Sequence, residues 1–321
     1  MLYLLIMTAL AVNASSQSLV RWDRVLDQRS DWYGSTEARA IADAVLAWQL
    51  DTGAWPKNID MTKPPAAGKK PDASESTIDN GATNTQIRFL GRVYQKTHQT
   101  RYQEAARRGI EYLLSAQYPN GGWPQYFPLR QGYYSLITFN DDAMARTMTV
   151  LWDVADASGD LAGFDDRLRS RARAAVQKGI DVILATQIRV DRRLTAWGQQ
   201  HDQATLEARP ARTFERASLV SAESAGLVRV LMRIENPAPR VVDAIEAAVA
   251  WLRTVRLSDG RWARFYEIGT NRPIFVGRDA VVRYRLEEIE EERQKGYSWY
   301  GTYAASLLER DYPAWKQRIA R

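Results

Sequence analysis

Charged side chains occur at three places where a helix is expected to begin. Asp79 precedes the first of these helices, Asp141 and Asp142 precede the second, and Arg212 precedes the third. Carboxylate oxygens suit a hard cation such as Ca²⁺, and a guanidinium group is complementary to a carboxylate ligand. If the three helix starts face one opening, these groups form a binding site there. The structural alternative for Asp79 and Asp141 is helix capping, which Asp performs routinely.

A tryptophan repeat predicts how those helix starts are arranged. An apolar helical stretch runs into a tryptophan at Trp55, Trp123, Trp197 and Trp262. Repeated units of about 70 residues each accommodate two helices and their connections, and they cannot bury their apolar faces alone. Three intervals therefore predict three helical hairpins in a toroid, with the tryptophans in the core and their loops at one rim.

The apolar periodicity gives the elements of this all-α fold. A helix is expected over 36–50, and a closing helix over 298–309 is expected to pack against it. Short strands are expected near 274–276. The hairpins are predicted over 79–97 with 100–118, 142–158 with 165–188, and 216–235 with 239–256.

Composition narrows the class of ligand. The chain has 321 residues, 45% of them hydrophobic, and a formal net charge of +6. This balance is typical of proteins that bind polyanions, but no Lys/Arg run or nucleic-acid motif is present, so we expect no nucleic-acid partner. The 11 tryptophans, 15 tyrosines and abundant arginines suit an acidic carbohydrate.

Cysteine and histidine usage excludes several kinds of site. The chain has no cysteine and only two histidines, His98 and His201. Zinc-thiolate sites, cysteine nucleophiles and His-rich metal centres are therefore excluded. His201 is expected at the same rim as the charged groups and stays a weak candidate for the site.

The N-terminus is typical of an exported protein. Residues 1–18 contain an apolar core too short to cross a membrane, followed by small residues, although no Lys/Arg precedes it. We predict a signal peptide over 1–18 and one catalytic domain over 19–321. The mature protein is then secreted or periplasmic, without stable membrane association, and is expected to be a monomer.

Nine segments resemble polysaccharide lyase family 10, the bacterial pectate lyases. They occur in the family's order and span the chain from about residue 36 to 312. They read W-P-K-N-I-D-M (55–61), T-I-D-N-G-A-T (77–83), G-G-W-P-Q-Y-F-P-L (121–129), T-F-N-D-D-A-M (138–144), A-W-G-Q-Q-H-D-Q-A-T-L (196–206), A-R-T-F-E (211–215), S-A-E-S-A-G-L (221–227), F-Y-E-I-G-T-N-R-P-I-F-V-G-R-D (265–279) and G-Y-S-W-Y-G (296–301).

The resemblance implies a fold, a reaction and a cofactor. The family fold is an (α/α)₃ toroid, in agreement with the three hairpins expected from the repeat. The family uses calcium to cleave (1→4)-α-D-galacturonan, or polygalacturonate, by β-elimination, which gives 4,5-unsaturated oligogalacturonates. These properties are expected of this chain by resemblance.

The resemblance also assigns roles to residues. Arg212, in the A-R-T-F-E segment, matches the family's catalytic base. Asp79 and Asp141 match calcium and substrate-carboxylate contacts, and Asn140 and Asp142 are assigned with them less directly. Substrate binding is expected at Arg278, Arg272, Lys57 and Asn80. The chain departs from the family pattern at Arg216, which follows this segment and changes neither the acids nor the base.

The chemistry explains these residue types. Removing a proton next to a carboxylate adds charge to an anion, and calcium and arginine at that carboxylate stabilise the enolate-like transition state. Arginine, however, is protonated in nearly all proteins and is a poor base at its ordinary pKa. The assignment of Arg212 therefore requires nearby cations and alkaline conditions.

Two other functions fit the same cleft. An inverting glycoside hydrolase needs two carboxyl groups about 6.5–9.5 Å apart, a pair that Asp79 and Asp141 would have to supply. It would release saturated sugars. A non-catalytic polyuronate-binding protein would keep the cleft and lack turnover.

Overall fold

The computed structural model describes residues 20–69 and 71–320, and the predicted signal peptide lies outside them. Helices dominate this part of the chain. They are α1 (Thr36–Trp48), α2 (Asn84–Thr97), α3 (Thr100–Ser115), α4 (Ala143–Ala155), α5 (Asp166–Thr186), α6 (Ser221–Leu231), α7 (Pro239–Thr254), α8 (Glu291–Lys295) and α9 (Tyr312–Ile319).

The strands are two residues long and form antiparallel pairs that pin loops together. The predicted short strand near 274–276 is confirmed by β8. The pairs are β1 (Ile137–Thr138) with β4 (Gln200–His201), β2 (Arg189–Val190) with β3 (Arg193–Leu194), β5 (Leu219–Val220) with β7 (Phe265–Tyr266), β6 (Trp262–Ala263) with β10 (Tyr300–Gly301), and β8 (Phe275–Val276) with β9 (Val282–Arg283).

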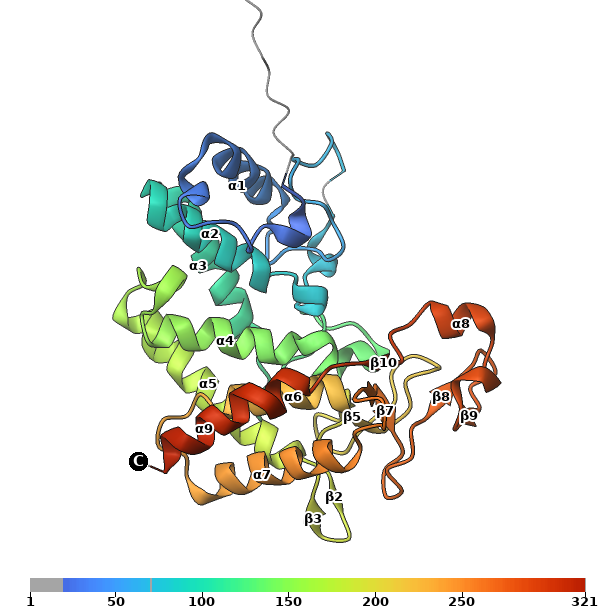
Figure 1. The fold of residues 1–321 in the computed structure, drawn as a ribbon. Helices are drawn as coiled ribbons and strands as arrows, with labels where there is room; N and C mark the ends of the chain where they lie inside the picture. Colours follow the sequence, from blue (N-terminus) through green and yellow to red (C-terminus); the bar gives the residue numbers. More distant parts are fainter. Residues whose placement is uncertain (1–19, 70, 321) are drawn as a thin grey trace, which may run out of the picture.

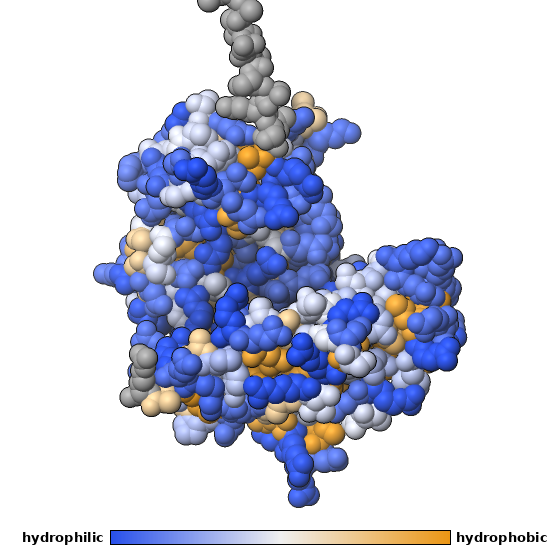
Figure 2. Space-filling view, viewed as in Figure 1, coloured by the Kyte–Doolittle hydropathy of each residue, from blue (hydrophilic) through white to orange (hydrophobic). Residues whose placement is uncertain are grey.

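The predicted hairpins are confirmed as α2–α3, α4–α5 and α6–α7, and they follow one another through the molecule (Figure 1). The first helices of the hairpins, α2, α4 and α6, pack in succession on the inner side. The second helices, α3, α5 and α7, do the same on the outer side. The all-α toroid is therefore confirmed, and Figure 2 shows its face hollowed between the N-terminal helices and the C-terminal residues.

The inner helices begin later than predicted. α2 starts at Asn84 instead of residue 79, and α6 starts at Ser221 instead of residue 216. Single 3₁₀ turns precede α2 and α4, at Asp79–Gly81 and Asn140–Asp142. The second residue of each turn has a positive φ, which a regular right-handed helix does not allow. These polar residues therefore lie in turns outside the helices.

The prediction for the C-terminal helix is wrong in its limits and its partner. Tyr300–Gly301 forms β10, and the helical tail begins with a π-helical turn at Leu307–Asp311 that leads into α9. The tail packs on the third hairpin, where Arg229 Nε donates to Asp311 Oδ2 at 2.8 Å and Lys316 Nζ donates to Glu246 Oε1 at 2.8 Å. These charged partners lie on α6 and α7 and not on α1.

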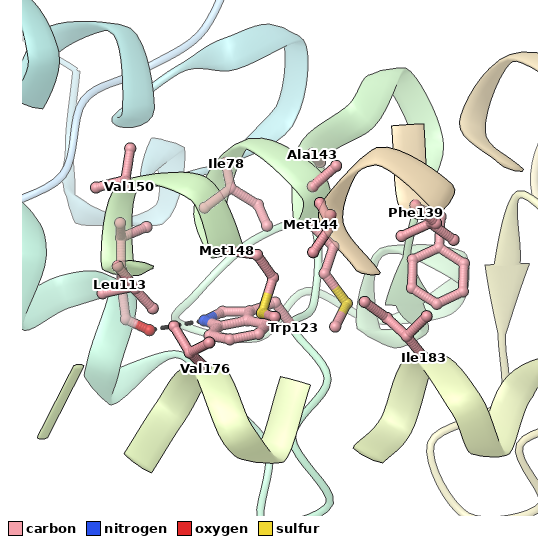
Figure 3. Packing of buried hydrophobic residues seen from close by; sticks show 14 of the residues in the cluster. Ile78, Leu113, Trp123, Phe139, Ala143, Met144, Met148, Val150, Val176 and Ile183 are labelled. Atoms are coloured by element: carbon pink, nitrogen blue, oxygen red, sulfur yellow. Dashed lines mark hydrogen bonds between the residues drawn. The ribbon is translucent and has the colours of Figure 1, made fainter. Parts of the chain in front are cut away.

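The repeat tryptophans are core residues, as predicted. Each indole is fully buried. Each Nε1–H donates to a carbonyl near the end of the helix before it: Trp55 to Val45 at 2.8 Å, Trp123 to Leu113 at 2.7 Å, Trp197 to Ile183 at 2.7 Å, and Trp262 to Leu252 at 2.8 Å. Figure 3 shows Trp123 enclosed by Leu113, Met148 and Val176. The bond satisfies both a buried donor and a helix-terminal acceptor.

A glutamine joins each tryptophan loop to the next hairpin. Its side-chain amide donates to a carbonyl of its own loop and to a carbonyl of the following outer helix. The pairs are Gln49 to Gly53 and Ala105, both at 2.8 Å; Gln117 to Gly121 at 3.0 Å and Ala175 at 2.9 Å; and Gln187 to Thr195 at 3.0 Å and Ala244 at 2.9 Å. The last repeat has Arg256 in this place, and its Nε donates at 3.4 Å to Gly260 of its own loop.

A smaller apolar cluster supports the C-terminal lobe, which carries β8, β9 and α8 in Figure 1. Phe265, Phe275 and Trp299 form its centre, beside the main core of the hairpins. Among residues 20–69 and 71–320, every helix is too short or too polar to cross a lipid bilayer.

We predict that Gln187→Ala lowers the free energy of unfolding by about 2 kcal/mol, because a buried hydrogen bond to Ala244 and a partly buried one to Thr195 are lost. Urea denaturation measures this, with Gln203→Ala as the matched control because that glutamine is exposed. Equal midpoints for the two variants would contradict the role of the glutamine link.

Candidate active site

Asp79 is a buried carboxylate whose two oxygens are both occupied. Asp79 is 2% exposed. Lys57 Nζ pairs with Oδ2, and Asn140 Nδ2 donates to Oδ1 at 3.5 Å. The N-cap position of α2 is Thr83, so the capping interpretation of Asp79 is wrong. Burial alone would lower the pKa of Lys57, but the bond to Asp79 outweighs it and the pKa is raised. Lys57 is therefore a permanent cation.

Asp141 is the more accessible carboxylate of the two, with a side chain 37% exposed. Its Oδ2 accepts from Asn140 Nδ2 at 2.9 Å, and its Oδ1 accepts from Arg264 Nη2 at 3.0 Å. Its φ of 51° directs it out of the helix. The N-cap position of α4 is Asp142, which makes no side-chain capping bond, so capping is also wrong for Asp141. Asn140 links the two aspartates.

Arg264 and Glu223 complete this network, and the sequence analysis missed both. Arg264 Nη2 donates to Glu223 Oε1 at 2.6 Å as well as to Asp141. Glu223 lies in the first turn of α6 and is 1% exposed. Burial alone would lower the pKa of Arg264, but the charges of Glu223 and Asp141 outweigh it and the pKa is raised. Arg264 is therefore a fixed positive charge behind Asp141.

Arg212 lies in the loop before β5 and not at a helix start. Its Nε donates to Glu215 Oε2 at 2.9 Å, and its Nη2 pairs with the other oxygen of Glu215. Glu215 is buried, whereas the Arg212 side chain is 45% exposed. The hydrogen bond to Glu215 is the main reason that the pKa of Arg212 is raised. In this state Arg212 is a cation that faces the solvent.

Tyr297 connects the two arginines. Its ring centroid lies 5.2 Å from the guanidinium carbon of Arg264 and 5.9 Å from that of Arg212. Its hydroxyl donates to Glu215 Oε1 at 3.3 Å. Arg212 is thus one aromatic ring away from Arg264, which binds Asp141.

Asp142 points into a different space. Its Oδ1 fits against Gly226, where a Cβ would come within 2.1 Å of it. It lines an inner cavity of about 460 Å³ between α2, α4 and α6. Burial first, and then the charge of Glu223, raises the pKa of Asp142 to about 6. The metal role expected for Asp142 thus falls on a side chain that is turned into the inner cavity.

The structure does not join the other two predicted arginines to this network. Arg278 lies on the C-terminal lobe, where its Nε pairs with Glu292 and its side chain is 65% exposed. Arg272 lies on the same lobe, with its guanidinium carbon 3.4 Å from the ring centroid of Tyr284. Both are available to a ligand only at the edge of the lobe.

Asn80 follows Asp79 and is exposed, with Nδ2 donating to Asn58 Oδ1 at 2.8 Å. Asn58, Asn80, Asp141 and Asp142 all have positive φ angles. Such backbone strain concentrates at functional sites, where the surrounding structure holds it in place. The strained residues here lie on the two turns and the loop that carry the network.

His201 has a structural role, so the hypothesis of a site histidine is wrong. The residue is fully buried. Its Nε2 accepts from the Gly198 N–H at 3.0 Å, and its Nδ1 lies 2.9 Å from the Leu206 carbonyl oxygen, to which it donates. Burial lowers the pKa of His201 to about 4, so the ring stays neutral.

The tryptophan repeat contained the signal for the missed residues. The second residue after each repeat tryptophan is polar: Lys57, Gln125, Gln199 and Arg264. Lys57 and Arg264 bind the two aspartates, and Gln199 Nε2 donates to Asn140 Oδ1. Each tryptophan anchors its loop, so the side chain two residues later has a defined direction.

The donor set fits an open calcium site better than a closed one. Within residues 20–69 and 71–320, no three Asp, Glu, His or Cys side chains are grouped so that they enclose a cation. Calcium takes six to eight oxygen ligands. Both aspartates accept hydrogen bonds, but the Asp141 side chain is 37% exposed and can contact a cation in the cleft, whereas the Asp79 side chain is buried. Oxygens of a bound anionic ligand are therefore needed to complete the shell.

Fold and site together define a helical toroid with an accessible carboxylate and two arginines at its mouth. The family model described as Pectic acid lyase matches residues 49–261 and 258–308. The chain therefore belongs to the pectic acid lyase family, and the resemblance seen in the sequence is confirmed.

Two solved structures are similar over most of the chain. Both are the family 10 polysaccharide lyase from Cellvibrio cellulosa, at 32% identity and 91% coverage of this chain. An alanine mutant of that lyase in complex with trigalacturonic acid gives a TM-score of 0.82 over 96% of its length, and the second structure gives 0.81 over 95%. A comparison with curated proteins finds no match. The chain is thus a polysaccharide lyase by family and fold.

We predict that His201 makes the protein less stable in acid. An unfolded histidine has a pKa of about 6.5, whereas that of folded His201 is about 4. The unfolded state binds more protons between these pH values, so the contribution of about 3 kcal/mol is complete above pH 6.5 and is lost as the pH falls toward 4.

Denaturant titrations at several pH values test this. His201→Gln flattens the acid side of the stability profile, and His98→Gln, at an exposed histidine, leaves it unchanged. Identical slopes for wild type and His201→Gln would contradict the prediction.

Proposed function

We propose that this chain is a calcium-dependent pectate lyase that cleaves (1→4)-α-D-galacturonan by β-elimination, to give 4,5-unsaturated oligogalacturonates. The observation that carries the proposal is the accessible Asp141, backed by the fixed cation Arg264 and joined through Tyr297 to the exposed Arg212. Family membership and the trigalacturonic acid complex of the similar lyase support a galacturonate substrate.

The fixed positive charges of the site favour a reaction on an anionic uronate over a reaction on an uncharged sugar. The step removes the C5 proton next to a carboxylate, so negative charge develops on a group that is already anionic. Arg264 and Lys57 place positive charge at the mouth before the substrate arrives, which is the preorganised stabilisation that such a step requires. Calcium at Asp141, together with the substrate carboxylate, would supply further neutralisation of that charge.

Arg212 is our candidate for the base. Burial raises the pKa of Tyr297 and of Tyr133, so both phenols stay protonated and neither serves as a base. His201 is fixed by the backbone. Arg212 is exposed at the mouth, but its bond to Glu215 raises its pKa and opposes the loss of a proton. Activity is therefore expected to rise well above neutral pH.

The reaction needs no nucleophilic water. Arg212 first loses a proton to solvent under alkaline conditions, and the neutral side chain then takes the C5 proton. The electron pair of the C5–H bond forms the C4=C5 double bond, and the C4–O4 bond breaks with its pair leaving on O4. The leaving O4 then takes a proton from solvent, and Arg212 returns its proton to solvent. The residues of the site therefore orient and neutralise the substrate, with one proton transfer to the protein.

The hydrolase alternative fits the site poorly. An inverting hydrolase needs a carboxylic acid that holds a proton for the leaving group. Both oxygens of Asp79 and both oxygens of Asp141 accept hydrogen bonds, from Lys57, Asn140 and Arg264. A proton on either carboxyl group would have to compete with the cations Lys57 and Arg264 for the same carboxylate.

The proposal includes a location, since polygalacturonate is an extracellular polymer. A secreted or periplasmic monomer agrees with the signal peptide expected at residues 1–18. Fractionation of the native host, followed by N-terminal sequencing of the mature protein, would test both export and the cleavage position.

We predict that Arg212→Ala reduces turnover of polygalacturonate by at least about 10³-fold, in the range expected when a reacting group is lost. Affinity for polygalacturonate stays within about threefold, because Lys57 and Arg264 remain. The matched control is Arg216→Ala, an exposed arginine in the same loop. Assays of turnover and calorimetric binding decide the outcome. Loss of binding with normal turnover of the bound polymer would contradict the role.

We predict that Asp141→Ala needs a higher calcium concentration for activity than the wild type does, so that high calcium partly restores turnover. Loss of one carboxylate removes ligand oxygens but leaves those of the substrate. Asp51→Ala, at an exposed aspartate outside the network, is the matched control. If the activity of Asp141→Ala does not respond to calcium at all, Asp141 is not part of the metal shell.

A further inference from the structure

A large groove continues from the active site toward the N-terminus. It has a volume of about 690 Å³, which is within the usual range of ligand pockets. Lys57 and Asn80 line its inner end, so it is continuous with the network around Asp79. Residues 21–27 form its outer wall.

Arg146 adds a positive charge to this groove, and it also lines the adjoining cavity that holds Asp142. It lies in the first turns of α4, is exposed, and lines the groove. Within the part of the chain that the structure describes, its guanidinium group makes no ion pair or hydrogen bond, unlike the arginines of the catalytic network. A free guanidinium group at the side of a groove is complementary to a carboxylate ligand.

The acidic residues of the groove are already engaged. Asp23 pairs with Arg21 at 2.7 Å, Asp27 pairs with Arg24 at 3.0 Å, and Asp60 Oδ1 accepts from the Thr62 hydroxyl at 2.8 Å. These contacts satisfy the carboxylates locally. Among the charged side chains that line the groove, Arg146 and Asp60 are therefore the two without an ion pair in the described part of the chain, and Arg146 is the one that attracts a carboxylate ligand.

Two further side chains suit a sugar ring. Trp22 lies on the wall, partly exposed, with its edge packed against Phe89 at a centroid distance of 5.9 Å. Gln86 lies at the floor, 1% exposed, and its carboxamide oxygen has no hydrogen-bond partner among the described residues. An aromatic surface, a hydroxyl acceptor and a cation together match the faces, hydroxyls and carboxylate of a uronate.

We propose that this groove is an additional binding region for acidic polysaccharide, which holds uronate units beyond those at Asp141. Arg146 binds a carboxylate of these units, and Trp22 packs against a sugar ring. The identity of the polymer rests on the proposed function. The wall at 21–27 lies outside residues 49–308, which the family model covers, whereas Arg146 and the inner end of the groove lie inside them.

The test compares long and short ligands. Calorimetry measures the binding of hexagalacturonate and of trigalacturonate to Arg212→Ala and to the double variant that also carries Arg146→Ala. The Arg212→Ala substitution is present in both proteins to prevent turnover. The matched control is Arg167→Ala, an exposed helical arginine that has no ion pair among the described residues and lines no part of the groove. Trp22→Ala is a second variant, and near-ultraviolet circular dichroism verifies that each variant is folded.

We expect Arg146→Ala to weaken the binding of hexagalacturonate by about tenfold, the effect of one charge-assisted hydrogen bond, and to leave trigalacturonate within about twofold. Trp22→Ala shows the same dependence on length, and Arg167→Ala changes neither ligand. An equal loss for both lengths, or no loss for either, would overturn the proposal.

The result separates this inference from the proposed function. A length-dependent loss of binding together with no lyase activity in the wild type would uphold the groove and refute the lyase. Lyase activity together with binding that is indifferent to Arg146 and Trp22 would uphold the lyase and refute the groove.

Discussion

The hydrogen bonds between each tryptophan loop and the next outer helix determine the rest of the structure. Gln49, Gln117 and Gln187 each join two successive repeats through backbone carbonyls, while the repeat tryptophans close their own helices. Backbone acceptors fix the position of a hairpin more strictly than side-chain packing does, since they do not move independently of the helix. The inner helices consequently begin at one mouth, and the side chains two residues after the tryptophans reach the same place.

The active site follows from that arrangement as an alternation of charges. A chain of hydrogen bonds runs through the site, from Lys57 through Asp79, Asn140 and Asp141 to Arg264, which also donates to Glu223. Buried charges are costly unless they are paired, so each enclosed acid has a cation or an amide beside it. The groups that stay accessible are Asp141 and Arg212, and these have the opposite charges that a calcium-bound polyuronate requires.

The sequence predicted the parts that depend on local periodicity. The hairpins, the buried tryptophans and the meeting of Asp79 and Asp141 follow from apolar spacing and repetition, and the family model confirms the resemblance. The prediction of the partner of the C-terminal helix was wrong, because that partner is set by contacts between residues distant in sequence, Asp311 with Arg229 and Lys316 with Glu246. The direction of Asp142 depends on a turn with positive φ, and the pairing of Glu223 with Arg264 joins residues that are distant in sequence; periodicity encodes neither.

The central claim is that this site eliminates where a hydrolase would add water. Ultraviolet absorbance during incubation with polygalacturonate at alkaline pH, first with calcium and then with a chelator, tests it most directly. The account predicts a rise in absorbance from the new C4=C5 bond that is present with calcium and absent with the chelator. New reducing ends without any rise in absorbance would contradict it.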